Sequence, residues 1–307
     1  MPEPVNAIAV LSGRLLTCIA NYRRAREAGK TVSAVARLAL LGTVVIVLAG
    51  CVERMFFYPD AVTYTTPAQL GVKVEDIHVV SGDRARLHGW FMPAVGQAKA
   101  TVLHLHGNAA NISNHLPLVA WLPARGYNVL MIDYRGFGRS EGKPSLDGIV
   151  DDAAAALTYL RTRPDLDATR LIVFGQSIGG ATALRLLARD ADGVRLAVID
   201  SAFTSYRGIA REATAGGPLG PVAALAAGVL PGFDKDPITA LKSIRLPLIF
   251  VHGARDSIIA AVNSEQLHAA APGSQHWSVP DAMHIMALAQ PGSWREKLVQ
   301  AMDEAVR

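Results

Sequence analysis

The sequence predicts an α/β domain with a doubly wound, mostly parallel sheet and helices on both of its faces. Three observations lead to this fold class. The chain has 307 residues, half of them hydrophobic and 18% charged, which is enough to bury one core of the size found in enzymes. Short apolar runs alternate with helical stretches from residue 75 onward. Polar clusters follow several of these runs, and sheets of this kind bind ligands at the carboxyl ends of their strands.

The first predicted strands form an antiparallel hairpin over residues 75–80 and 87–92, where apolar and polar residues alternate. The later runs are apolar throughout and are bounded by turn residues, which is typical of parallel strands buried on both faces. These runs are 101–106, 128–134, 170–176, 196–200 and 247–252, with a shorter one at 276–279.

Helices are predicted between and after these strands, and the alternation indicates right-handed βαβ units. Their ranges are 112–124, 146–161, 178–189, 263–271 and 294–306. Residues 214–231 are unusually rich in small apolar side chains. They could form a modest cap over the ligand site or a loosely packed pair of surface helices.

The positive charge of the chain is concentrated in its first 50 residues. Six basic and two acidic residues there account for the whole net charge of +4, and the remainder has 24 of each sign. A formally neutral body argues against a nucleic-acid binder. Cys18 and Cys51 both lie near the start, so we expect neither a disulfide framework nor a cysteine metal site, and no metal or organic cofactor.

Residues 38–52 contain no charge, but this run is short for a membrane span, which needs about 20 residues. It ends in Leu48-Ala49-Gly50-Cys51, which resembles a bacterial lipoprotein signal with Cys51 as the lipidated residue. We therefore expect an exported protein anchored to a membrane and facing the periplasm or the outer side. The alternative is a short, tilted membrane helix that is not cleaved. The expected organisation is a leader (1–50), a tether (51–74) and a catalytic domain (75–307).

The strongest chemical motif is Gly175-Gln176-Ser177-Ile178-Gly179, which lies between a predicted strand and a predicted helix. This context is typical of a nucleophile elbow, a sharp turn that exposes a serine hydroxyl above the sheet. Gly175 and Gly179 remove side chains that would collide with the neighbouring strand and helix.

A serine nucleophile needs a general base and an acid that orients the base, in the order serine, acid, histidine for this arrangement. Asp256 directly follows the strand at 247–252, and His284 follows the last predicted strand. Asp281 is a competing acid close to His284. His104 and His252 lie within strands and are expected to be buried. The remaining candidates occupy predicted surface or hairpin positions: His78, His88, His115, His268 and His276.

An oxyanion requires two backbone N–H donors. Ile178, the residue after the nucleophile, supplies one. The segment His106-Gly107-Asn108 resembles an oxyanion turn, in which Asn108 would supply the other, although a plain strand-to-helix turn remains open. Asp133 and Arg135, in the glycine-rich loop after the next strand, are expected to form structural ion pairs.

From about residue 77 onward the chain resembles the α/β-hydrolase superfamily, in particular its serine aminopeptidase-like branch with a minimal cap. The motifs HGNAAN, DYRGFGRSEG, GQSIGG and HGARDS occur in the order of that family. The resemblance implies a small acyl ester or thioester as substrate, since the branch contains esterases, thioesterases and lysophospholipases. An acyltransferase using the same triad and a membrane-tethered, non-catalytic binding module remain alternatives. One departure is Met283, where the family usually has a small residue before the histidine.

Overall fold

The computed structural model describes residues 56–214 and 235–307, which belong to one compact unit, Glu53–Arg307. The predicted leader, Cys51 and nearly all of the predicted cap segment lie outside the described residues. Within the described part of the chain, no helix is both long enough and apolar enough to cross a membrane.

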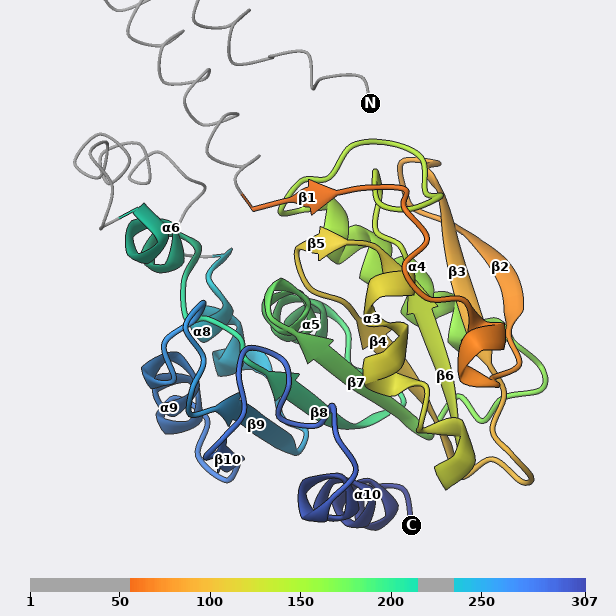
Figure 1. The fold of residues 1–307 in the computed structure, drawn as a ribbon. Helices are drawn as coiled ribbons and strands as arrows, with labels where there is room; N and C mark the ends of the chain where they lie inside the picture. The colour runs from red at the N-terminus through yellow and green to blue at the C-terminus, as the bar shows by residue number, and fades with distance from the viewer. Residues whose placement is uncertain (1–55, 215–234) are drawn as a thin grey trace, which may run out of the picture. The chain divides into compact units, whose positions relative to one another are not determined.

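The centre of the domain is an eight-stranded sheet with the order β10-β9-β8-β7-β4-β6-β3-β2 (Figure 1). The two pairings of β3, with β2 and with β6, are antiparallel, and the other pairings in this described sheet are parallel, so the sheet is mostly parallel, as predicted. The strand bounds are β2 Glu75–Val80, β3 Arg86–Met92, β4 Ala100–Leu105, β6 Tyr127–Ile132, β7 Leu171–Gln176, β8 Val194–Asp200, β9 Leu248–Gly253 and β10 Gln275–Val279.

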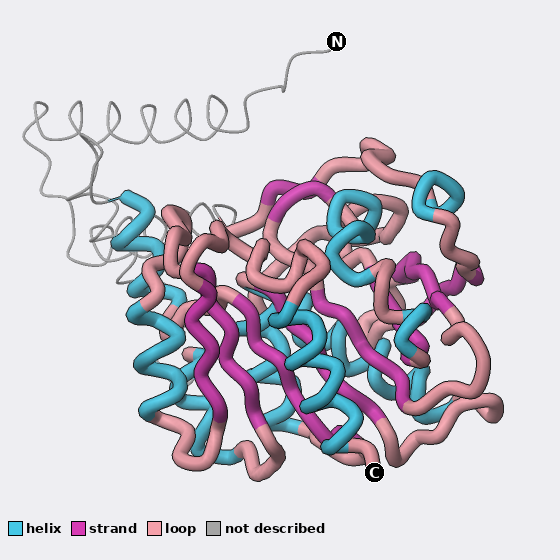
Figure 2. Tube along the Cα trace, turned by 60° about the horizontal axis from the view of Figure 1, so that its bottom comes forward, coloured by secondary structure: helices cyan, strands magenta, loops and turns pink. Residues whose placement is uncertain are grey.

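Helices cover both faces of this sheet (Figure 2). Because strand side chains alternate between faces, Val102 and Val129 point to the face covered by α3 (Ile112–Val119) and α10 (Ser293–Ala305), with which they share one core. The helices α4 (Gly148–Thr162) and α5 (Ile178–Arg189) pack against each other and against other strand residues. The remaining described helices include α6 (Tyr206–Thr214), α8 (Pro237–Ala240) and α9 (Val262–Ala269).

The helix predicted over 112–124 is shorter than expected. It ends at Val119, and a separate 3-10 turn covers Pro123–Arg125. Proline has no backbone N–H to continue an α-helical ladder, so Pro123 begins the new turn instead. At the other end of α3, the side chain of Asn111 accepts a hydrogen bond from the Ser113 N–H at 3.0 Å and caps the helix.

The described part of the predicted tether packs onto the domain. Tyr58–Pro59 forms a short strand, β1, that pairs in parallel with β5 (Ala109–Ala110). Farther along, the Gly138 N–H donates to the Asp60 carbonyl at 2.9 Å. Residues 58–60 are therefore part of the folded domain rather than a free linker.

The strand register brings the carboxyl ends of β4, β7, β8, β9 and β10 together. Leu105 lies opposite Gly175, Gln176 opposite Asp200, and Gly253 opposite Val279. The loops that leave these ends therefore converge at one edge of the sheet, which is where the predicted site residues lie.

Candidate active site

Ser177 occupies a strained turn between β7 and α5, with φ 57° and ψ −122°. The close approach of neighbouring backbone explains the two glycines of the motif. A Cβ on Gly179 would lie 2.1 Å from the Leu105 carbonyl oxygen, and one on Gly175 would lie 2.4 Å from the Gly179 carbonyl oxygen. The Ser177 N–H donates to the Asp200 carbonyl at 2.8 Å, which ties the turn to β8. Positive φ at a non-glycine residue stores strain, and here it presents the serine at the start of a helix.

Asp256 and His284 form a hydrogen-bonded pair, with 2.7 Å between Nδ1 of His284 and Oδ2 of Asp256. The Asp256 side chain is fully buried and that of His284 is 14% exposed. The other carboxylate oxygen of Asp256 accepts the N–H groups of Ile258 and Ile259, both at 2.9 Å. Because Asp256 accepts on both oxygens, it is held in one orientation against the imidazole.

The pKa of Asp256 is lowered despite its burial. Burial alone would raise that pKa, but hydrogen bonds from His252 and His284 outweigh this effect. Nε2 of His252 donates to the Ile259 carbonyl at 2.9 Å and lies 3.2 Å from the Asp256 carboxylate. Burial would lower the pKa of His252, but these contacts with Asp256 and Ile259 outweigh it and raise that pKa. Asp256 is therefore ionised and can stabilise a positive charge on His284.

Asp281, the competing acid, lies in a different environment. Its side chain is 82% exposed and faces Arg255 at 3.1 Å. The carboxylate that contacts His284 is that of Asp256.

A side-chain hydrogen bond orients a peptide group in the loop after β4. Nδ1 of His106 donates to the Gly107 carbonyl at 2.7 Å. The Gly107 carbonyl and the Asn108 N–H belong to the same trans peptide and point in opposite directions. The bond from His106 to this carbonyl therefore also sets the direction of the Asn108 N–H. A Cβ on Gly107 would lie 3.7 Å from the Ser177 Cβ, which shows how closely the loop approaches the nucleophile. The N–H of Ile178 lies in the first turn of α5 and has no acceptor within that helix.

An apolar cavity of about 170 Å³ opens beside Ser177. This volume is close to that of a buried cavity that holds a benzene molecule. It is lined by Phe56, Tyr58, Asn108, Ser177, Ile178, Phe203, Ile209, Ala210, Ile258 and Ile259.

Three histidines pack together in the core at the loop that follows β4, residues 106–111, which carries the predicted donor Asn108 and is named the oxyanion loop. His115 was predicted at the surface, and this is wrong, because the inner face of α3 carries it into contact with His104 and His106 at ring-centroid distances of 6.4 and 5.3 Å. Burial lowers the pKa of His104 to about 3 and that of His115 to about 4, and it also lowers the pKa of His106. The cluster is neutral near pH 7.

His88 lies in the predicted hairpin but is buried rather than exposed. Its two ring nitrogens lie 3.0 Å from Asp133 and 2.6 Å from Asp76. Asp133 also accepts the Ile112 N–H at 2.8 Å, and Arg135 pairs with the buried carboxylate of Asp152 at 2.7 Å. These contacts confirm that Asp133 and Arg135 are structural.

Sequence reasoning missed a polar network behind the nucleophile. Gln176 donates to Asp200 at 2.9 Å, and the hydroxyl of Ser201 donates to the same carboxylate at 3.1 Å. Ser201 accepts the Ile285 N–H at 3.2 Å, and Ile285 has φ 53°, an uncommon conformation for a β-branched residue. The network therefore fixes the backbone directly after His284. The Asp-Ser pair at the end of the strand predicted over 196–200 was the available signal.

Met283, the departure from the family pattern, is 62% exposed. Its side chain therefore extends into solvent, and its size does not disturb the packing around His284.

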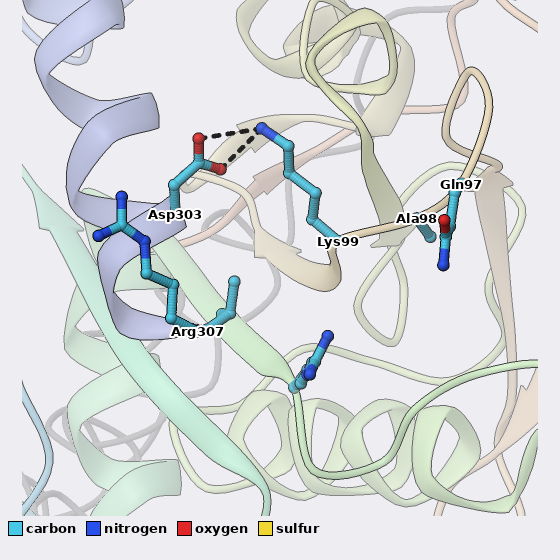
Figure 3. Close-up of a pocket in the computed structure, with 7 residues that line it drawn as sticks. Gln97, Ala98, Lys99, Asp303 and Arg307 are labelled. Atoms are coloured by element: carbon cyan, nitrogen blue, oxygen red, sulfur yellow. Dashed lines mark hydrogen bonds and ion pairs between the residues drawn. The ribbon is translucent and has the colours of Figure 1, made fainter.

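A second cavity, of about 410 Å³, lies away from this site (Figure 3). Lys99 and Asp303 form an ion pair at 2.8 Å on its wall, next to the amino ends of β4 and β7. Among the described residues, its lining includes no serine or histidine. No group of three histidine, cysteine, aspartate or glutamate side chains within residues 56–214 and 235–307 is arranged to hold a metal ion.

The chain is similar to known proteins in sequence and in fold. The family model described as "Serine aminopeptidase, S33" matches residues 96–231. The chain is 36% identical over 272 residues to the uncharacterized protein YfhR of Escherichia coli K12, covering 83% of this chain and 91% of that protein. It is 34% identical over 237 residues to the α/β-hydrolase domain-containing protein WAV2 of Arabidopsis thaliana, covering 72% and 75%.

Solved structures show the same fold. The Pyrococcus furiosus esterase Pf2001 superposes with a TM-score of 0.68 at 22% identity, covering 81% of this chain and 100% of that one. Together with the strand order and the serine turn, these matches show that the chain belongs to the α/β-hydrolase superfamily.

Proposed function

We propose that this protein is a serine hydrolase that cleaves carboxylic esters or thioesters through an acyl-enzyme intermediate. The observation that carries the proposal is the buried Asp256–His284 pair, which shares one edge of the sheet with the strained turn of Ser177. A weak serine hydroxyl becomes a nucleophile when an oriented imidazole accepts its proton.

In this mechanism the Ser177 oxygen attacks the acyl carbonyl and its proton passes to Nε2 of His284. Asp256 accepts the Nδ1–H of His284, fixes the tautomer and stabilises the imidazolium. The N–H groups of Asn108 and Ile178 donate to the oxyanion. His284 then protonates the departing alcohol or thiol, and a water molecule deprotonated by His284 hydrolyses the acyl-serine. These steps use side chains and backbone of the chain itself and call for no metal or cofactor.

The lining of the cavity favours an acyl group over a peptide. Aromatic and aliphatic side chains form most of its wall, and none of the described lining residues is charged. Release of an N-terminal amino acid requires a group that pairs with the ammonium of the peptide, and the described lining offers none. Esters and thioesters with short to medium acyl chains are therefore the proposed substrates.

Location is a separate part of the proposal. The uncharged run 38–52 ending in Leu48-Ala49-Gly50-Cys51 supports an exported hydrolase that is held to a membrane by lipid on Cys51. The substrate would then be met at or near a bilayer surface.

The proposed activity is tested with Ser177→Ala. We expect wild-type protein to react covalently with a fluorophosphonate probe and to hydrolyse p-nitrophenyl butanoate, and the folded variant to lose labelling and at least about 10³-fold in kcat. Adding an alcohol during turnover and measuring ester products separates hydrolysis from acyl transfer. A folded wild type that neither labels nor turns over any ester or thioester would instead indicate a non-catalytic binding module.

A further inference from the structure

We infer that the N-terminal strap, residues 56–62, is a working part of the active site, in which Phe56 limits the length of the acyl chain and the backbone of the strap holds the oxyanion loop. This inference rests on the proposed function, because it concerns the same cavity and the same loop. No motif of the sequence analysis gave these residues a role in the site.

Phe56 forms one wall of the cavity beside Ser177. It is 8% exposed, and its ring meets the ring of Tyr206 edge-on at 5.7 Å. Tyr206 in turn contacts Phe203, another lining residue, at 5.2 Å. The ring of Phe56 is therefore held by aromatic neighbours of α6 and of the loop after β8, and it does not swing aside freely. A fixed aromatic wall sets the depth of a small apolar cavity.

The strap is also bonded to the loop that carries the oxyanion donor. The Tyr58 N–H donates to the Asn108 carbonyl at 2.8 Å, and the Asp60 N–H donates to the Ala110 carbonyl at 3.3 Å. Asn108 is thus held on two sides, by His106 through the preceding peptide and by Tyr58 through its own carbonyl. Fixed donors stabilise an oxyanion best, because they need no reorganisation during the reaction.

Asn111, the last residue of the HGNAAN motif, fastens the strap. Its side-chain amide donates to the Asp60 carboxylate at 2.9 Å and to the Val62 carbonyl at 2.8 Å. The oxygen of the same amide caps α3 through the Ser113 N–H. One side chain therefore connects the strap, the end of the oxyanion loop and the start of a core helix, and it acts as a positioning residue.

The proposed effect of Phe56 on acyl chain length is tested by substitution. In the full-length protein, Phe56→Ala removes the aromatic wall and extends the cavity. We expect kcat/KM for p-nitrophenyl octanoate relative to butanoate to rise about tenfold or more, because added apolar contact favours the longer chain. Phe56→Leu should give an intermediate ratio, and it also keeps the test open if the alanine variant does not fold. Val95→Ala is the matched control: it truncates an apolar residue that is 73% exposed and lies outside both the strap and the cavity lining, and should leave the ratio unchanged.

The fastening role is tested by exchanging charges. Asn111→Asp keeps an oxygen to cap α3 but loses the amide donor and faces Asp60 with a like charge. We expect kcat to fall about tenfold or more for both esters with a smaller change in KM. The double variant Asn111→Asp/Asp60→Asn restores a donor–acceptor pair between positions 60 and 111 but not the bond to the Val62 carbonyl. It should therefore recover part of the loss, which a general loss of packing would not do.

The outcomes separate the two proposals. Absence of labelling and turnover in the wild type would overturn the proposed function and this inference with it. A second outcome is an active wild type whose octanoate-to-butanoate ratio of kcat/KM does not change in folded Phe56→Ala or Phe56→Leu. A third is a kcat that Asn111→Asp leaves unchanged. Either result would overturn the role of the strap and leave the hydrolase proposal intact.

Discussion

Asp256 and Asp281 differ in environment far more than in residue type. The side chain of Asp256 is fully buried, accepts N–H groups from two backbone positions and contacts His284. Asp281 faces solvent and pairs with Arg255. Exposed ion pairs contribute little, whereas a buried acceptor that fixes an imidazole controls its tautomer.

We therefore expect Asp256→Asn to lower kcat/KM by about 10⁴ and Asp281→Asn to change it by less than about twofold. Both variants keep a similar side-chain volume, so circular dichroism should show folded protein in each case. Ester hydrolysis under single-turnover conditions measures the chemical step directly. A larger loss for Asp281→Asn than for Asp256→Asn would show that the acid is misassigned.

At the scale of elements, β4, the oxyanion loop and α3 are joined by the neutral histidines His104, His106 and His115. The pKa of each is lowered by burial in the folded protein, whereas the unfolded chain titrates near 6.5. Below that pH the unfolded state binds more protons, so folding is disfavoured as the pH falls.

This linkage predicts marked acid sensitivity. Each histidine contributes up to about 1.4 kcal/mol per pH unit to the pH dependence of the free energy of unfolding. Together the three should lower this free energy by about 4 kcal/mol per pH unit between pH 6 and pH 4. Above about pH 7.5 they should have no such effect. Urea unfolding at a series of pH values measures the slope. His115→Gln should reduce it by about one third, and His78→Gln, at an exposed hairpin position, should not. Equal slopes in wild type and His115→Gln would contradict the neutral cluster.

For most strands of the sheet, the local sequence pattern is sufficient to predict where the strand begins and ends. The strands β4, β6, β7, β8 and β9 lie within two residues of their predicted bounds, because each is a short apolar run bounded by turn residues. The short strand β1 has no such pattern, because it consists of two exposed residues. Its strand conformation depends on its pairing with the short strand β5.

At the scale of the whole molecule, few residues separate the predicted lipidation site from the cavity lining along the chain. Cys51 precedes the cavity-lining Phe56 by five residues, which span at most about 18 Å when extended. An anchor on Cys51 would therefore keep the cavity close to the bilayer.

The anchor is tested by Cys51→Ser. Two or more acyl chains hold a protein through salt washing, since each buried methylene contributes about 0.8 kcal/mol. We expect the wild type to incorporate an alkyne palmitate analogue in a bacterial host, and Cys51→Ser to remain unlabelled and to migrate as an uncleaved precursor. Cys18→Ser is the control and should behave as wild type if Cys18 leaves with the leader. An unlabelled wild type would favour an uncleaved membrane helix and leave the hydrolase proposal untouched.

The sequence by itself determined the order in which strands and helices follow one another along the chain, the turn at Ser177, and the positions of Asp256 and His284 after that turn. These depend on local pattern, on glycine beside a sharp turn and on polar residues directly after apolar runs. Tertiary structure alone decided which carboxylate meets His284, that His115 is buried, and that Phe56 completes the cavity. Each of these depends on contacts between residues distant in sequence, as when the ring of Phe56 packs on Tyr206, and local periodicity carries no information about such partners.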